Sequence, residues 1–223
     1  MHWHDTLNIA ALALALGAVH AFDADHIAAV SALASRAEPG QDPAVLSRRG
    51  IAYAIRWALG HGTVLVAAAL AAAALRLRLP EAVSQIAERA VGIVLIATGI
   101  ALLWSLRVQR IGLHAHRHGS VSHLHLARSI RHDHAPVLVG LLHGLAGSAP
   151  MLAVIPVALW RPAAAAAYVL VFSAGVMAGM VAFGAALGRI QCAVAVRSPR
   201  SLAAFRLLLA GCTVGLGLAW LTR

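Results

Sequence analysis

Six long apolar segments constrain this chain more than any other feature. They cover about residues 7–30, 51–75, 86–107, 136–160, 163–188 and 204–222. Most reach the length of about 20 apolar residues that a helix needs to cross a bilayer. Hydrophobic residues make up 61% of the 223 positions, which leaves too little polar surface for a soluble domain. We therefore expect an all-α polytopic membrane protein with six transmembrane helices, in which residues 1–223 form a single transmembrane domain.

The arginines between these segments predict the orientation of the chain. All 18 basic side chains are arginine, and the formal net charge is +10. The breaks after the first, third and fifth segments hold Arg36, Arg48, Arg49, Arg107, Arg110, Arg117, Arg128, Arg131, Arg189, Arg197 and Arg200, whereas the opposite side holds Arg76, Arg78, Arg161 and Arg223. Because short basic loops stay in the cytoplasm, we predict a multi-pass protein of the cell inner membrane with both termini extracytoplasmic. The charge thus indicates topology, and we expect no nucleic-acid partner.

The five tryptophans lie close to the expected helix ends. They are Trp3, Trp57, Trp104, Trp160 and Trp220, each within a couple of turns of the end of a predicted segment. Because tryptophan is enriched at both membrane–water interfaces, this placement predicts an interfacial aromatic belt.

Four ionisable residues interrupt the first apolar segment: His20, Asp23, Asp25 and His26. An aspartate at the bilayer centre costs about 2.5–3.5 kcal/mol on insertion scales, so such residues normally face a bundle interior and mark a functional site. On a regular helix Asp25 would point away from the other three, whereas a loosened backbone near His20 would turn it inward. Imidazole and carboxylate donors without thiolate suit Zn, Ni, Co or Mn. A proton relay, or a structural hydrogen-bonded cluster, without a metal is the alternative.

These residues match a family pattern. His20-Ala21-Phe22-Asp23-Ala24-Asp25-His26-Ile27 resembles the signature helix of the nickel/cobalt transporter family, and Leu59-Gly60-His61-Gly62-Thr63-Val64 is similar to its second motif. The family's later Gly-Phe-Asp-Thr-Ala-Thr-Glu motif is replaced by the run from Leu142 to Pro150. That run is more like shorter relatives, which include nickel/cobalt efflux proteins and urease- or hydrogenase-associated membrane proteins. The resemblance implies divalent nickel or cobalt as the transported substrate.

Two further histidines are expected at similar depth in the membrane. With the predicted topology, His61 lies about ten residues from the cytoplasmic end of the second segment and His143 about seven residues into the fourth. At about 1.5 Å per residue the helical histidines fall within roughly 10 Å of depth, so adjacent helices could share one or two ions. A hydrogen bond to a neighbouring helix carbonyl is the alternative role for His61 and His143.

A weak internal repeat links the first and fourth segments. Gly17-Ala18-Val19-His20 and Gly140-Leu141-Leu142-His143 share a Gly-x-x-His pattern. Three segments per half would make the two halves inverted in the membrane, an arrangement typical of transporters. Two inverted three-helix repeats are therefore a hypothesis for the fold.

Histidines also gather in two other places. The predicted cytoplasmic His-rich loop, 108–135, contains His114, His116, His118, His123, His125, His132 and His134. Their irregular spacing favours low-affinity metal binding in a loosely structured tract, with simple solvation as the alternative. At the start of the sequence, the amine of Met1 with His2 and His4 could chelate a square-planar ion as an external capture point, provided that the terminus is unprocessed.

Together these features predict a transporter and not an enzyme. The expected metal ligands are His20, Asp23, Asp25, His26, His61 and His143. Two carboxylates could neutralise a divalent ion and take up protons once it leaves, which offers a route to proton coupling. The sequence has no P-loop, and no cofactor is expected beyond the transported Ni²⁺ or Co²⁺.

The direction of transport and the functional class of the protein stay open at this point. The first motif slightly favours uptake over efflux, because it matches the uptake family closely. A metal-delivery accessory membrane protein is an alternative that the His-rich loop would suit equally well. An intramembrane zinc hydrolase is a further alternative, disfavoured because the chain has no His-Glu-x-x-His motif.

Overall fold

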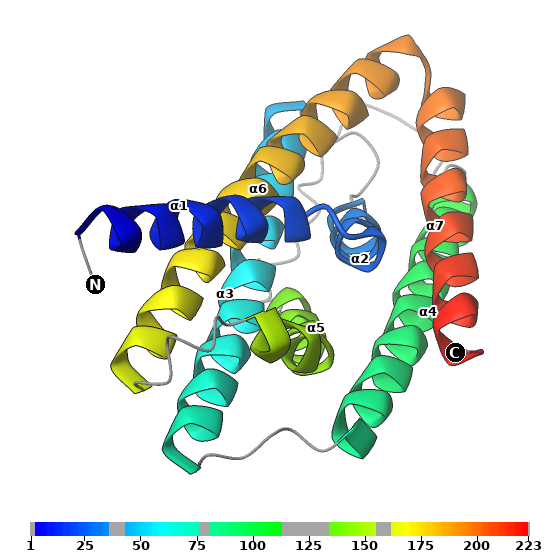
Figure 1. Ribbon diagram of the computed structural model, residues 1–223. Coiled ribbons are helices and arrows are strands. Elements are labelled where there is room, and N and C mark those ends of the chain that lie inside the picture. The colour runs from blue at the N-terminus through cyan, green and yellow to red at the C-terminus, as the bar shows by residue number, and fades with distance from the viewer. Residues whose placement is uncertain (1–2, 36–42, 76–80, 113–133, 155–161, 223) are drawn as a thin grey trace.

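The computed structural model describes residues 3–35, 43–75, 81–112, 134–154 and 162–222, and all regular secondary structure in this part of the chain is helical, as predicted. The helices of these residues are drawn and labelled in Figure 1. They are α1 (Trp3–His20), α2 (Ala24–Ala34), α3 (Pro43–Leu75), α4 (Glu81–Gly112), α5 (Ala135–Val154), α6 (Pro162–Arg197) and α7 (Pro199–Leu221).

The described helices account for four or five of the six predicted membrane spans. Within the described residues, α3, α4, α6 and α7 are each long and apolar enough to cross a bilayer. Residues Thr6–His20 and Ala24–Ala34 would make a fifth span if counted together, and they are bent by 57°. The fourth predicted segment begins as a shorter apolar helix, Ala135–Ala146, and six spans remain a prediction.

The connection between α6 and α7 is shorter than the sequence suggested. Instead of a polar break over residues 189–203, α6 continues to Arg197 and α7 begins at Pro199. Arginine is a good helix former, so its charge does not end the helix. The single residue between them, Ser198, caps α7 by accepting a hydrogen bond at Oγ from the Ser201 N–H at 3.0 Å. Pro199 at the first helical position needs no such partner.

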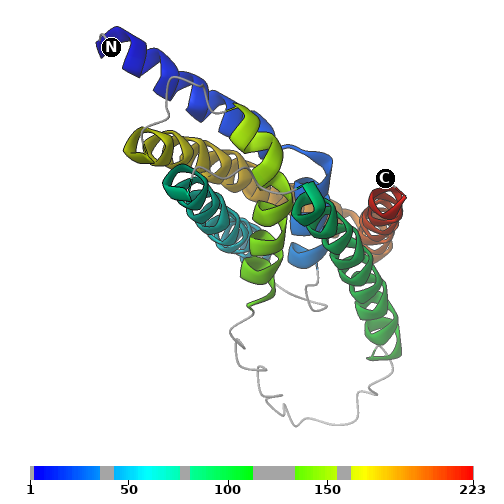
Figure 2. The ribbon, with the colours of Figure 1, turned by 60° about the horizontal axis from the view of Figure 1, so that its bottom comes forward.

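The helices pack in two groups with α2 between them. In the first group α3 and α6 lie side by side, α1 crosses α6, and α5 packs on α3 (Figure 1). The second group is the pair α4 and α7. Figure 2 shows α2 lying between the two groups, and it contacts α3, α4 and α7. The short helix α2 therefore sits at the centre of the bundle.

Glycines allow close approach at the crossings nearest to the sequence motifs. A Cβ at Gly17 would overlap the backbone of Phe172 where α1 crosses α6. A Cβ at Gly140 would overlap the backbone of Trp57 where α5 crosses α3. Small residues at such crossings are typical of membrane bundles, since lipid supplies no hydrophobic force between helices. Each glycine lies three residues before a motif histidine, so these crossings position both histidines.

Candidate metal centre

The first predicted span is broken at its motif. α1 ends at His20 and α2 begins at Ala24. The carbonyl oxygen of His20 accepts hydrogen bonds from the Asp23 N–H at 3.1 Å and from Nδ1 of His26 at 3.0 Å. Such unwound backbone is tolerated in a membrane protein where other groups satisfy it. Of the two possibilities that the sequence left open, a regular helix and a loosened backbone near His20, the structure contains the loosened backbone.

Asp23 occupies the N-cap position of α2 without capping it. Its side chain makes no cap hydrogen bond, because its Oδ2 lies 2.7 Å from Nδ1 of His20. Asp25 follows in the first turn of α2, where the positive end of the helix dipole favours a carboxylate. The break thus turns both aspartates toward histidines.

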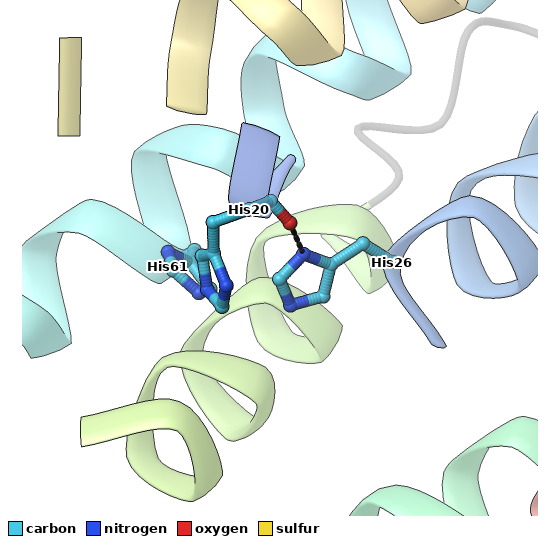
Figure 3. Close-up of side chains that lie close together, drawn as sticks. All are labelled: His20, His26 and His61. Atoms are coloured by element: carbon cyan, nitrogen blue, oxygen red, sulfur yellow. Dashed lines mark hydrogen bonds between the residues drawn. The ribbon is translucent and has the colours of Figure 1, made fainter. Parts of the chain in front are cut away.

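Four histidines from four helices meet at this break: His20 of α1, His26 of α2, His61 of α3 and His143 of α5. We call them the histidine cluster. The distances between ring centroids are 4.6 Å for His20–His26, 5.6 Å for His20–His61, 5.2 Å for His26–His61 and 5.7 Å for His26–His143. The first three rings lie close together in Figure 3. The structure therefore brings together all four helical histidines that the sequence placed at similar depth.

Hydrogen bonds at Nδ1 orient three of these rings. Nδ1 of His26 donates to the His20 carbonyl (dashed in Figure 3), and Nδ1 of His143 donates to the Val139 carbonyl at 2.8 Å. A carbonyl can only accept, so the proton lies on Nδ1 and the lone pair on Nε2. The carboxylate of Asp23 fixes His20 in the same way. A carbonyl or carboxylate at Nδ1 is the usual support of a metal-ligating histidine.

Several nitrogens of the histidine cluster have no hydrogen-bond partner among the described residues. They are Nε2 of His20, Nε2 of His143 and both ring nitrogens of His61. Because buried polar atoms are nearly always paired, such atoms need an explanation. Donor atoms of His20, His26 and His61 lie within 4.8 Å of one another, which is close enough to hold one metal ion.

Asp25 extends the cluster toward a second group of donors. Its Oδ2 lies 3.9 Å from Nε2 of His26 and 4.0 Å from Nε2 of His143. Asp23, Asp25 and His26 also offer three donor atoms within 4.8 Å of one another. All six predicted ligands therefore lie in one region of the structure.

Two aromatic residues that were not predicted as part of the site pack against the histidine cluster. Trp57, expected in the interfacial belt, is fully buried, and its ring stacks on His61 with centroids 4.9 Å apart. Phe172 lies 5.4 Å from His20. The signal for Trp57 was its spacing, since residues four apart share one face of a helix. Trp104, in contrast, is 68% exposed, as a belt residue would be.

The other candidate ligands are not brought to this centre. Met1, His2 and the loop histidines His114, His116, His118, His123, His125 and His132 lie outside the described residues. His4 belongs to α1 but precedes His20 by sixteen positions, about 24 Å along a helix. His134 is exposed at the start of α5. Cys192 is half-buried and Cys212 is exposed, and neither is among the candidate ligands within the described residues.

Comparison with known proteins places the chain in a membrane family. Residues 27–218 match the family described as cytochrome C biogenesis protein transmembrane region. The chain belongs to this family. It is therefore a multi-pass membrane protein, in agreement with its apolar helices. The match contains His61 and His143 but begins after the motif that holds His20, Asp23, Asp25 and His26.

A curated relative points to a more specific association. The chain is 30% identical over 189 residues to urease accessory protein UreH of Bacillus sp. (strain TB-90), covering 82% of this chain and 78% of the relative. The resemblance drawn from the motifs included urease-associated membrane proteins, and this relative agrees with that part of it. No solved structure matches the chain significantly.

Proposed function

We propose that this protein moves Ni²⁺ or Co²⁺ across the membrane through the histidine cluster together with Asp23 and Asp25. The observation that carries the proposal is the set of buried ring nitrogens that have no hydrogen-bond partner among the described residues and are held together inside a membrane bundle. Desolvating such nitrogens costs free energy unless something binds them. Imidazole suits nickel, cobalt and zinc, and carboxylates would balance the charge of a divalent ion.

The relative favours nickel among these metals. It is named for urease, and urease is a nickel enzyme, so a role linked to nickel follows for a related membrane protein. Cobalt remains a second substrate in the proposal, because its ligand preferences overlap with those of nickel. The ion is cargo here, and we assign no resident cofactor and no enzymatic step.

Alternating access would come from the two helix crossings beside the histidine cluster. Gly17 of α1 lies against Phe172 of α6, and Gly140 of α5 lies against Trp57 of α3. Each half of the chain thus places a Gly-x-x-His helix on a long helix of the other half. This correspondence supports the inverted-repeat hypothesis, in which one pair rocks against the other around a fixed site. Protonation of Asp23 and Asp25 after release would couple transport to protons.

Radioactive nickel flux in proteoliposomes of known orientation tests the proposal. We expect wild type to move nickel, His20→Ala to lose at least about tenfold of the rate, and the control Glu88→Gln on α4 to keep it. The sign of the flux under an imposed proton gradient decides between uptake, which we propose, and efflux. Equal flux in wild type, His20→Ala and empty vesicles would contradict transport through this site.

A metal-delivery accessory role is the second candidate, because the relative is named an accessory protein. In that role the predicted cytoplasmic loop 108–135 would pass metal to a maturation factor. The protein would then bind nickel without moving it, and replacing the loop histidines would abolish transfer to the partner. Binding without flux in wild type would favour this role.

A further inference from the structure

Two sets of donor atoms overlap at the break between α1 and α2. We name His20, His26 and His61 the inner site, and Asp23, Asp25 and His26 the outer site. In each set the three donor atoms lie within 4.8 Å of one another. Ligands bound at about 2.0–2.2 Å lie at most about 4.4 Å apart, so either set needs only a small contraction to enclose an ion.

His26 belongs to both sites, but only one of its two ring nitrogens can bind a metal ion. Its Nδ1 donates to the His20 carbonyl at 3.0 Å and therefore carries the proton. The remaining lone pair is on Nε2, which lies 3.9 Å from Oδ2 of Asp25. One lone pair binds one metal ion. The inner and outer sites therefore cannot both be filled with His26 as a ligand.

The most exposed side chain of the two sites is that of Asp23 and the most buried is that of His61. Asp23 is 51% exposed, His20 24%, Asp25 13% and His26 3%, while His61 is completely buried. An ion arriving from the exposed side therefore meets the carboxylate of Asp23 first and the imidazole of His61 last. Nickel and cobalt accept both kinds of ligand and are well suited to imidazole.

We propose that the two sites form a relay in which an ion bound by Asp23 and Asp25 passes to His20 and His61 while His26 stays bound throughout. The relay rests on the transport function proposed above. In it, the two aspartates bind the ion before His20 and His61 do. The passage exchanges two oxygen donors for two nitrogen donors. Asp23 holds His20 with Oδ2, so its second oxygen is available to the ion while His20 keeps its orientation.

Nickel binding to purified full-length variants tests the relay. His61→Leu, with His20→Ala as a second choice, removes the inner site, and Asp25→Asn weakens the outer one. Glu88→Gln and Gln85→Ala, both on α4, serve as controls outside both sites. Equilibrium dialysis counts bound Ni²⁺ per chain, and X-ray absorption distinguishes nitrogen from oxygen ligands. Size-exclusion chromatography checks that each variant is folded.

We expect wild type to bind one Ni²⁺ with mainly imidazole ligands. His61→Leu should still bind one ion, at least about tenfold more weakly and with more oxygen ligands. Asp25→Asn should keep wild-type affinity yet move nickel at least about tenfold more slowly in proteoliposomes. Both controls should behave as wild type.

The outcomes separate the relay from the transport function. Two bound ions per chain, or wild-type flux in Asp25→Asn, would overturn the relay and leave transport standing. Loss of all binding in both inner-site variants that remain folded would also overturn it. A wild type that binds nickel but moves none overturns the proposed transport, and with it the relay as a transport path.

Discussion

The indole of Trp57 lies stacked on the imidazole of His61, with ring centroids 4.9 Å apart and planes inclined by 23°. The same indole contacts the rings of His26 at 4.7 Å and of His143 at 5.5 Å. Trp57 therefore touches three of the four residues in the histidine cluster. An ion bound there would lie within a few ångströms of one particular tryptophan.

Tryptophan fluorescence should therefore report metal binding. Ni²⁺ and Co²⁺ quench nearby indoles, so titration of either ion into wild type should lower the emission in a saturable way. Trp57→Phe should lose this component, whereas Trp104→Phe, which changes an exposed ring on α4, should retain it. Equal saturable quenching in Trp57→Phe and wild type would contradict binding at the histidine cluster.

The candidate ligands were predictable because charge is costly in a membrane. The first apolar run is interrupted by four ionisable residues, His20, Asp23, Asp25 and His26. Ionisable residues inside a membrane segment are costly and normally mark a functional site. The break at Ala21–Asp23 was not predictable in the same way. It contains no proline or glycine, and it depends on the His26 ring satisfying the carbonyl of His20, a contact that requires the folded structure.

Trp57 shows a second limit of one-dimensional reasoning. Its distance from a predicted helix end is the same whether the ring faces lipid headgroups or the bundle interior. Only the packing of α5 on α3, with Gly140 against the backbone of Trp57, encloses the ring. Six of the seven histidines of the His-rich loop and the residues Met1 and His2 lie outside the described residues and stay predictions.

His61→Leu should stabilise the metal-free protein. Both ring nitrogens of His61 are buried without a hydrogen-bond partner among the described residues, and the side chain is completely buried. Replacing such a group by an apolar one of similar size removes an unsatisfied polar penalty of about 1–3 kcal/mol. Thermal unfolding in detergent should therefore give a higher Tm for His61→Leu than for wild type without metal.

The matched control for this variant is His134→Leu, which changes an exposed histidine at the start of α5 and should leave Tm unchanged. A higher Tm for metal-free His61→Leu is what we expect of a site that is retained for function at the expense of stability. A lower Tm for metal-free His61→Leu would show that the ring makes favourable contacts, such as its stacking on Trp57, that outweigh its unpaired nitrogens.

Gly17→Ala and Gly140→Ala should both destabilise the bundle and slow transport. At each position a Cβ would overlap a backbone carbonyl, that of Phe172 or that of Trp57, so the crossing helices must separate. Overpacking of this kind costs about 1–3 kcal/mol. Gly211→Ala is the control, because a Cβ added at Gly211 would have no described atom within 4 Å, and alanine favours a helix. Equal Tm values for all three variants would contradict close packing at these crossings.

Removing metal with a chelator should lower the Tm of wild type, and adding Ni²⁺ should restore it. An ion that binds only the folded protein stabilises it by about 2.7 kcal/mol at 100 times its dissociation constant. Mg²⁺ should have little effect, because it prefers oxygen ligands to imidazole. His20→Ala should lose most of the nickel-dependent rise, whereas His134→Ala should keep it, since only His20 belongs to the histidine cluster. A rise of equal size in both variants would show that nickel stabilises the protein from another site.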